Sequence, residues 1–146
     1  MSNVREILKT KGTAVWSVDP AAKVGDTIKM MAEKNVGAVL VLDGKKIMGI
    51  FSERDFIRNA AKTNLCTTQE ALVKDMMTSR ILFVGPSQTT EECMSLMTAK
   101  RIRHLPVIEN EELVGLISIG DVVNKIIQDQ KFSITQLERY VTGGAY

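Results

Sequence analysis

Apolar and polar residues follow two different spacings in the first half of the chain. Residues 26–34 place apolar side chains three and four positions apart with charged residues between them, which predicts an amphipathic helix. Residues 36–42 are rich in β-branched residues and almost free of polar ones, which predicts a strand covered on both faces. The turn sequence DGKK then leads to a second predicted strand over residues 47–51, and a helix is expected from Ser52 onward.

The same order of elements recurs in the second half of the chain. The pattern predicts a helix over residues 91–100, a strand over 104–108, a turn at the sequence ENEE, a strand over 113–117 and a helix from Ser118. The same order of elements, found twice in one chain, indicates a duplicated unit.

Residue identities support the duplication. Residues 18–57 align with residues 84–123 at a constant offset of 66 without a gap. Eight of the forty aligned pairs are identical, whereas about two to three identities are expected by chance for an ordinary composition. Three of the identical pairs form a shared motif, Gly-x-x-Ser-x-x-Asp, at Gly49/Gly115, Ser52/Ser118 and Asp55/Asp121.

Short helical turns precede both repeats, at residues 4–8 and 73–77, and each is followed by an extended segment that ends before a proline. Each repeat therefore has the order lead-in turn, strand, helix, strand, strand, helix, which places the fold in the α/β (α+β) class. One repeat of about sixty residues cannot cover both faces of its sheet, so the two repeats are expected to pack through their sheets. We predict a first repeat over residues 1–66, a second over 67–130, and a C-terminal helix and tail over 131–146.

The C-terminal tail carries its own helix signal. Ser133 and Gln136 have the spacing of a capping box, and Gly143 and Gly144 would end the helix. One face of this helix is apolar, which favours a dimer contact or a docking site for another protein, with packing back on the module as the alternative. The apolar positions are Ile134, Leu137 and Val141.

Composition and charge exclude several classes. Hydrophobic residues at 45% and charged residues at 25% are typical of a globular protein, and a net charge of +2 does not favour a nucleic-acid or membrane-surface role. No apolar run is long enough to span a bilayer, and no secretory signal is recognisable at the start. Cys66 and Cys93 are too few for a disulfide framework, so a cytoplasmic or organelle-matrix location is expected. With His104 as the single histidine, a Cys/His metal site is not expected either.

The repeated motif can be interpreted in two ways. Ser52 follows a strand and opens a helix, so Ser52 and Asp55 could form a capping box and nothing more. The glycine at a fixed offset before the serine suggests, in addition, a close backbone approach. A helix start that follows a strand also suits a phosphate, and a carboxylate fixed there can accept ribose hydroxyls. The motif therefore indicates a candidate nucleotide site. No nucleophile elbow, Walker loop or dinucleotide glycine motif is present, so the chain is not expected to be an enzyme.

Together with the sequences RIRHLPVI at residues 101–108 and DMMT at residues 75–78, the duplicated motif resembles the CBS domain, which occurs in tandem as the Bateman module. The resemblance covers residues 4–127. It implies two βαββα repeats related by a pseudo-twofold axis, a homodimer, and two clefts that bind adenine nucleotides or related adenosyl ligands. It also implies a regulatory role toward an enzyme or channel.

The resemblance also implies which residues line the clefts. In the first cleft, Asp121 would hold the ribose and Ser118 a phosphate or ribose oxygen; Asp55 and Ser52 would take these roles in the second. The first cleft comprises Thr13, Ala14, Val36, Gly37, Ala38, Ile117, Ser118, Gly120 and Asp121. The second cleft comprises Phe51, Ser52, Arg54, Asp55, Ser79, Arg80, Ile102, Arg103 and His104.

The two clefts are expected to differ in charge. Arg103 and His104 align with Gly37 and Ala38, and Arg54 aligns with a glycine. The cleft around Asp55 is therefore expected to tolerate more phosphate, whereas that around Asp121 is expected to have small neutral neighbours.

Two functions remain open from the sequence. The first is a regulatory module that binds AMP, ADP, ATP or an NAD-type ligand and signals through its dimer or partner surface. The second is a ligand-free adaptor that keeps the fold for dimerisation. The retention of both motif aspartates favours the first. No catalytic cofactor is expected, and the choice of adenosyl ligand, the regulated protein partner and the orientation of the dimer stay open.

Overall fold

The computed structural model describes residues 1–143, apart from the side chains of residues 65 and 66, and divides the chain into two packing units. Unit 1 combines residues 1–14 with the chain from residue 82 onward, and unit 2 contains residues 15–81. Each unit contains helices and one small sheet within the described residues, so the mixed α and β class predicted from the sequence is confirmed.

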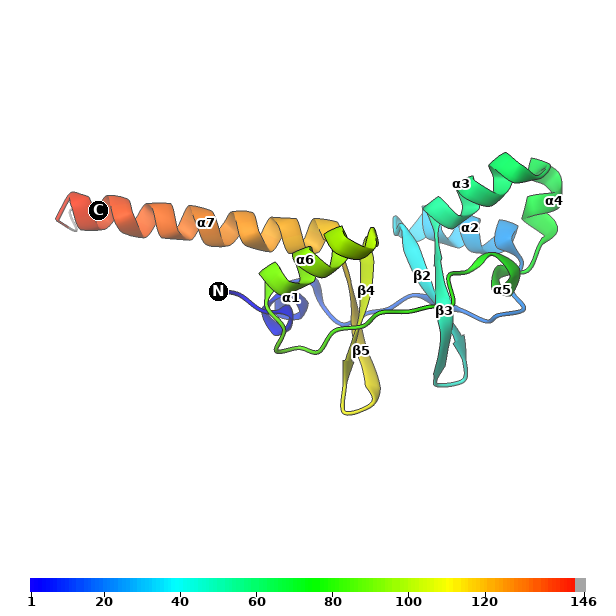
Figure 1. Ribbon diagram of the computed structural model, residues 1–146, viewed down its shortest axis with the longest axis horizontal. Helices are drawn as coiled ribbons and strands as arrows, with labels where there is room; N and C mark the ends of the chain where they lie inside the picture. The colour runs from blue at the N-terminus through cyan, green and yellow to red at the C-terminus, as the bar shows by residue number, and fades with distance from the viewer. Residues whose placement is uncertain (144–146) are drawn as a thin grey trace. The chain divides into compact units, whose positions relative to one another are not determined.

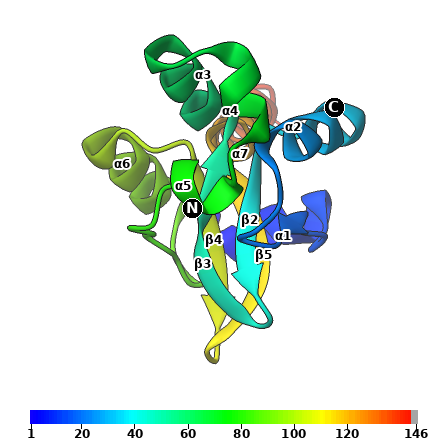
Figure 2. The same cartoon turned by 90° about the vertical axis from the view of Figure 1, so that its right-hand side faces the viewer.

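Unit 2 contains, in chain order, β1 (Ser17–Val18), α2 (Val24–Lys34), β2 (Ala38–Asp43), β3 (Lys46–Ser52), α3 (Glu53–Lys62), α4 (Leu65–Glu70) and α5 (Val73–Met76). β1 runs parallel to β2, and β2 pairs antiparallel with β3. Figures 1 and 2 show the turn of the β2–β3 hairpin at the end opposite α2 and α3. The first four residues of β2 are buried, which confirms a strand covered on both faces. The core consists chiefly of Val24, Met31, Val39, Val41, Phe51 and Val73.

Unit 1 contains α1 (Val4–Lys11), α6 (Thr90–Lys100), β4 (His104–Glu109), β5 (Glu112–Ser118) and α7 (Ile119–Val141). β4 and β5 form an antiparallel hairpin, and Val84 adds one parallel bridge to Val107. The helices α6 and α7 lie toward the end of this hairpin opposite its turn (Figure 1). The core consists chiefly of Val4, Ile7, Leu8, Val84, Cys93, Met97, Leu105, Val107, Ile117 and Val122.

The two packing units do not coincide with the two sequence repeats. The lead-in helix α1 precedes the first repeat in sequence but packs in unit 1 with the second repeat. The lead-in helix α5 precedes the second repeat but packs in unit 2 with the first. The hydrophobic core of each unit is therefore completed by the lead-in helix of the other repeat. Helix α4 is an addition that the sequence pattern did not predict.

The glycines that occupy the same position in the two repeats of the motif have a packing cause. A Cβ added at Gly49 would lie 2.7 Å from both the Thr78 carbonyl oxygen and the Met77 Sδ, and one added at Gly115 would lie 2.7 Å from Leu8 Cδ2. The close approach expected at these glycines therefore exists, but the lead-in segments make it, within the same unit. Since packing alone accounts for the glycines, they no longer argue for a ligand.

Replacing Gly49 with alanine is expected to lower the free energy of unfolding by about 1–3 kcal/mol, because the new methyl group meets a backbone carbonyl that cannot move without disturbing the sheet. Gly115→Ala is expected to cost less, since the methyl group meets the end of a flexible leucine side chain. Urea unfolding followed by circular dichroism measures both. Gly85→Ala is the control, because its Cβ would have only the Ile108 carbonyl oxygen near it, at 3.9 Å. Equal effects at Gly49 and Gly85 would contradict this explanation.

The C-terminal helix is present, but it does not begin at Ser133. Helix α7 runs without a break from Ile119 to Val141, so Ser133 lies in its interior and the predicted second capping box is wrong. Neither glycine nor proline interrupts residues 121–141, and Thr135 Oγ1 bonds back to the Lys131 carbonyl at 3.0 Å as an interior helix residue does.

Candidate functional site

The motif of unit 2 forms a tight corner where β3 ends and α3 begins. The Asp55 N–H donates to Ser52 Oγ at 3.3 Å, and the Ser52 N–H donates to Asp55 Oδ2 at 2.9 Å, so the predicted capping box is present. The Ser52 hydroxyl lies 3.1 Å from the same carboxylate oxygen. Thr78 Oγ1, from the segment after α5, donates to Asp55 Oδ1 at 3.2 Å. Both oxygens of this buried carboxylate are therefore held in place.

The motif of unit 1 forms an equivalent corner with a different partner. The Asp121 N–H donates to Ser118 Oγ at 3.1 Å, and the Ser118 N–H donates to Asp121 Oδ2 at 2.8 Å. Lys11 Nζ, at the end of α1, lies 2.6 Å from the same oxygen and also donates to the Leu116 carbonyl at 2.7 Å. We call this set, Lys11, Ser118 and Asp121, the lysine corner, and the set Ser52, Asp55 and Thr78 the threonine corner.

Charge at the lysine corner sets the ionisation of Asp121. Burial alone would raise the pKa of this carboxyl, but the hydrogen bonds from Lys11 and Ser118 and the positive charge of Lys11 outweigh burial. The pKa of Asp121 therefore lies below its ordinary value, and the carboxylate is charged at neutral pH. The expectation of small neutral neighbours around Asp121 is wrong, because the first lead-in helix brings a lysine to it.

Backbone hydrogen bonds connect the start of α3 to the residue before β2, and the start of α7 to the residue before β4. The Glu53 N–H donates to the Gly37 carbonyl at 3.0 Å, and the Ile119 N–H donates to the Arg103 carbonyl at 2.8 Å. Since the serine hydroxyls accept from the third N–H of each helix, two of the N–H groups at each helix start already have partners. A ligand at either corner would rely on the carboxylate and its side-chain neighbours more than on free backbone donors.

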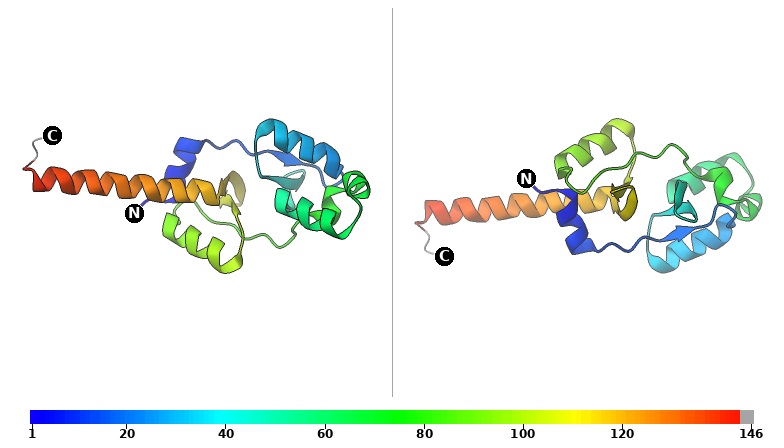
Figure 3. Two further views of the ribbon diagram at one scale, coloured as in Figure 1. Left: turned by 90° about the horizontal axis from the view of Figure 1, so that it is seen from above. Right: turned by 90° about the horizontal axis from the view of Figure 1, so that it is seen from below.

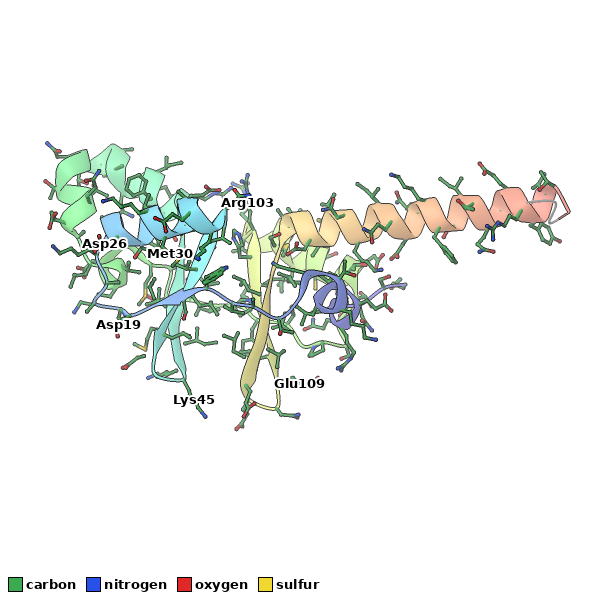
Figure 4. All side chains as sticks on the ribbon, turned by 180° about the vertical axis from the view of Figure 1, so that it is seen from behind. Asp19, Asp26, Met30, Lys45, Arg103 and Glu109 are labelled. Atoms are coloured by element: carbon green, nitrogen blue, oxygen red, sulfur yellow. The ribbon has the colours of Figure 1, made fainter. Side chains whose placement is uncertain are left out.

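Arg103 and His104 lie in unit 1, at the entry to β4, where Figure 4 labels Arg103. His104 is the cross-strand partner of Ser118. Burial lowers the pKa of His104, the charges of Lys11 and Arg103 lower it further, and Asp121 opposes them in part. The imidazole is therefore neutral at neutral pH and shares the electrostatic surroundings of the lysine corner.

The lowered pKa of His104 predicts how stability depends on pH. The folded protein binds this proton less readily than the unfolded chain, whose histidine titrates near 6.5. The free energy of unfolding is therefore expected to be unaffected by His104 above that pH and to fall as the pH drops below it. Urea unfolding between about pH 7 and about pH 5.5 measures this change. His104→Gln is expected to flatten the profile, because His104 is the sole histidine of the chain; an unchanged slope would contradict the prediction.

Some predicted site residues lie in the hydrophobic cores. Phe51 and Ile117 are 0% exposed and belong to the cores of unit 2 and unit 1, and Ala38 is 4% exposed. Strand alternation turns the side chains of Phe51 and Ile117 away from the face on which the adjacent Ser52 and Ser118 lie. Ala38 is the cross-strand partner of Ser52 and shares its face. The part that these three residues take in a cleft stays a prediction.

Other predicted residues remain accessible. Ser79, Arg80, Thr13 and Ala14 are exposed in the segments that follow the lead-ins, and Ile102, Val36 and Gly37 are partly buried. Thr13 lines a groove of about 230 Å³ together with Arg5, Pro86 and Glu109. A Cβ at Gly120 would find its nearest neighbour at 3.6 Å, so this position has space beside it. The pairing of each corner with residues of the other unit stays a prediction.

Two residues of the corners were missed at the level of the sequence. Thr78 lies in the sequence DMMT, but nothing in that pattern connected it to Asp55. Lys11 is separated from Asp121 by 110 positions. One weak signal for Lys11 existed in the sequence. Leu8 and Met77 occupy equivalent places beside the two motif glycines. Each is followed three positions later by a basic residue, Lys11 in the first lead-in and Arg80 in the second.

Other chemistry finds no support within the described residues. No group of three or more His, Cys, Asp or Glu side chains there could hold a metal ion. Burial, with a smaller contribution from Glu92, raises the pKa of the Cys93 thiol to about 11, so this buried cysteine is protonated and unreactive at neutral pH. The side chain of Cys66 lies outside the described residues. Over residues 1–143, none of the helices has the length and apolar character needed to cross a membrane.

Known proteins resemble this chain over most of its length. The mitochondrial CBS domain-containing protein CBSX3 of Arabidopsis thaliana is 31% identical over 98% of this chain and 73% of its own. The structure of a protein with CBS domains from Burkholderia ambifaria is 44% identical, with a TM-score of 0.81 over 88% of this chain and 96% of that one. The crystal structure of CBSX2 in complex with AMP is 25% identical, with a TM-score of 0.70 over 89% of this chain and 99% of that one. The family model of the CBS domain matches residues 4–62 and again residues 73–128, so the chain belongs to the CBS domain family and carries two copies of that domain.

Proposed function

We propose that this chain is a non-catalytic regulatory module that binds an adenine nucleotide, with Asp55 and Asp121 as the carboxylates that accept ribose hydroxyls. The observation that carries this proposal is the repeated corner, in which a serine N–H orients the aspartate carboxylate at 2.9 Å in one unit and 2.8 Å in the other. Two fixed acceptor oxygens suit the adjacent hydroxyls of a ribose. A capped helix alone would not require a third donor from the lead-in at each corner.

The neighbours of the two aspartates support a ligand that also carries phosphate. Lys11 supplies an ammonium at the lysine corner, and ammonium groups bind phosphate well. Thr78 supplies a hydroxyl at the threonine corner. CBSX2, whose structure contains AMP, supports AMP as the ligand to test first. ADP, ATP and NAD-type ligands share the adenosyl group and belong to the same proposal.

The proposed clefts combine each corner with the accessible segments predicted from the sequence. Thr13, Ala14, Val36 and Gly37 are assigned to the lysine corner, together with Gly120. Ser79 and Arg80 are assigned to the threonine corner, together with Arg54, Ile102, Arg103 and His104. Ligand binding at these places would alter the surface that the module presents to a protein partner, which is the proposed signal.

A ligand-free adaptor is the second candidate, and one observation favours it. Both aspartates already have partners within their own units, Lys11 for Asp121 and Thr78 for Asp55. Capping and these contacts satisfy the carboxylates without any ligand. Under this alternative, the corners stabilise the units and the fold serves association alone.

Isothermal titration calorimetry separates the two candidates. The wild-type chain is titrated with AMP, ATP, NAD and S-adenosylmethionine, and the measurement is repeated with Asp55→Ala and Asp121→Ala. The regulatory proposal expects heat from at least one ligand and a loss of affinity of about tenfold or more in at least one variant, because a hydrogen bond to a charged group contributes about 1.5–3 kcal/mol. No heat from any ligand would favour the adaptor.

The control for charge is Glu53→Gln, which removes one negative charge from an exposed position in the first turn of α3. This variant is expected to bind as the wild type does. A thermal unfolding curve of each aspartate variant is needed beside the titration, because loss of a capping box costs about 1 kcal/mol of stability and must not be mistaken for loss of binding.

A further inference from the structure

The second half of helix α7 is not covered by the rest of its unit. Its first turns pack on unit 1 through Val122, which is fully buried, and through Ile119 and Ile126. From Gln130 to Gly143 every residue is exposed. Figures 1 and 3 show α7 extending well beyond α1 and α6 of the same unit. Most of the stability of a helix in a protein comes from the packing of its apolar face and not from the helix propensity of its residues. An uncovered extension of this length therefore indicates a partner.

The exposed apolar side chains of α7 form a continuous stripe. They recur at alternating spacings of four and three positions, the heptad spacing of a coiled coil, with Gln130 at the single polar position. The stripe spans 18 residue steps, which corresponds to about 27 Å of helix. It consists of Val123, Ile127, Gln130, Ile134, Leu137 and Val141.

The apolar members of the stripe are accessible to water. Leu137 is 64% exposed and Ile134 is 56% exposed, and Val123 and Ile127 are exposed as well, although they lie beside the packed turns. Large exposed apolar patches on soluble proteins mark association surfaces. The stripe is therefore a surface for a second helix.

The charged residues beside the stripe indicate which helix binds it. Lys131 and Glu138 flank it along one edge, seven positions apart and so in equivalent heptad positions. The other edge carries Ile126, Ser133 and Tyr140 and contains no acidic or basic residue. Among the ion pairs of the described residues, none involves Lys131 or Glu138. The charged edge thus has opposite charges at its two ends, and neither side chain has an ion-pair partner among the described residues.

The arrangement of these charges distinguishes two ways of pairing the helix with itself. In a parallel pair, the charged edge of one copy faces the uncharged edge of the other, and the charges gain nothing. In an antiparallel pair, the charged edges face each other, so Lys131 of each copy meets Glu138 of the other. The same register places Ile134 of each copy against Leu137 of the other.

We propose that the second half of α7 binds the same segment of a second copy of this chain, antiparallel, in the register that pairs Lys131 with Glu138. The contact runs from Gln130 to Val141, about 17 Å of helix, and ends the exposure of its apolar side chains. We expect the pair to form reversibly, with a dissociation constant on the order of micromolar, about −8 kcal/mol. The inference does not depend on nucleotide binding.

Sedimentation velocity of the full chain over a range of concentrations tests the surface. The wild type is expected to form a dimer as the concentration rises, and Leu137→Gln is expected to raise the dissociation constant at least tenfold. Phe132→Gln is the matched control, since Phe132 is 66% exposed but lies on the far side of the helix from the stripe. It is expected to leave the dissociation constant unchanged. A monomeric wild type, or equal behaviour of the two variants, would overturn the proposal.

Charge reversal tests the antiparallel register. Lys131→Glu and Glu138→Lys are each expected to weaken the dimer, and the double variant is expected to restore it. An equimolar mixture of the two single variants is expected to form a heterodimer more readily than either forms a homodimer. Arg139→Glu changes the charge by the same amount away from the edge and is expected to have no effect. Absence of restoration in the double variant and of preferred heterodimers would overturn the register, whatever the outcome with Leu137→Gln.

Discussion

Phe51→Ala is expected to lower the free energy of unfolding of unit 2 by about 3–5 kcal/mol, the usual cost of truncating a phenylalanine in a packed core. Phe51 is 0% exposed and contributes to the core of unit 2 from near the end of the hairpin opposite its turn, where it pairs with Val39. A loss of this size is a large fraction of the total stability of a domain, so a substantial part of the variant would be unfolded near 37 °C.

The single tryptophan makes this effect measurable in one unit. Trp16 is the only tryptophan of the chain and lies in unit 2, so its fluorescence during urea unfolding reports on that unit. Ile57→Ala is the control, because Ile57 is 64% exposed in the same unit and its truncation should cost well under about 1 kcal/mol. A small loss of stability accompanied by a large loss of nucleotide affinity would contradict this core role and support a role of Phe51 in nucleotide binding.

The local elements of the fold could be predicted because their signals are local. The hairpins follow from apolar runs bounded by turn residues, and both capping boxes follow from a serine and an aspartate three positions apart. The alternation of side chains along a strand could also have separated Phe51 from Ser52, since adjacent strand residues face opposite sides. The family resemblance implied a ligand role for both residues, and the strand period places the side chain of Phe51 on the face opposite to that of Ser52.

Contacts between distant parts of the chain could not be predicted from these signals. Leu8 packs against Gly115, which places α1 with the second repeat. No pattern in the sequence around either residue indicates this contact. The Lys11–Asp121 pair has the same origin, since it exists only because α1 packs in unit 1. The continuity of α7 through Ser133 was missed for a different reason. A capping box signals where a helix can begin, and it is overridden when a helix already runs through the site.

Lys11→Met is expected to reduce the preference of the lysine corner for AMP over adenosine by about 10- to 100-fold. In the structure, the Lys11 ammonium contacts Asp121 Oδ2. We propose that the same carboxylate accepts a ribose hydroxyl. A ligand with a phosphate can take the ammonium over as its own partner, so the charge stays paired when the ribose arrives. A nucleoside cannot, and its hydroxyls must compete with the ammonium for Asp121. A hydrogen bond between charged groups contributes about 1.5–3 kcal/mol, which corresponds to the stated range.

Calorimetric titration of wild type and Lys11→Met with AMP and with adenosine measures the two affinities and their ratio. The variant is expected to bind AMP more weakly and adenosine more tightly, since it removes both the phosphate partner and the competitor for Asp121. Lys9→Met is the control, because Lys9 is an exposed lysine on the same helix that takes no part in the corner. A purely structural role for Lys11 would weaken both ligands by the same factor and leave the ratio unchanged. Since the threonine corner has a hydroxyl in place of the ammonium, the sites in which Asp55 and Asp121 take part should differ in this ratio.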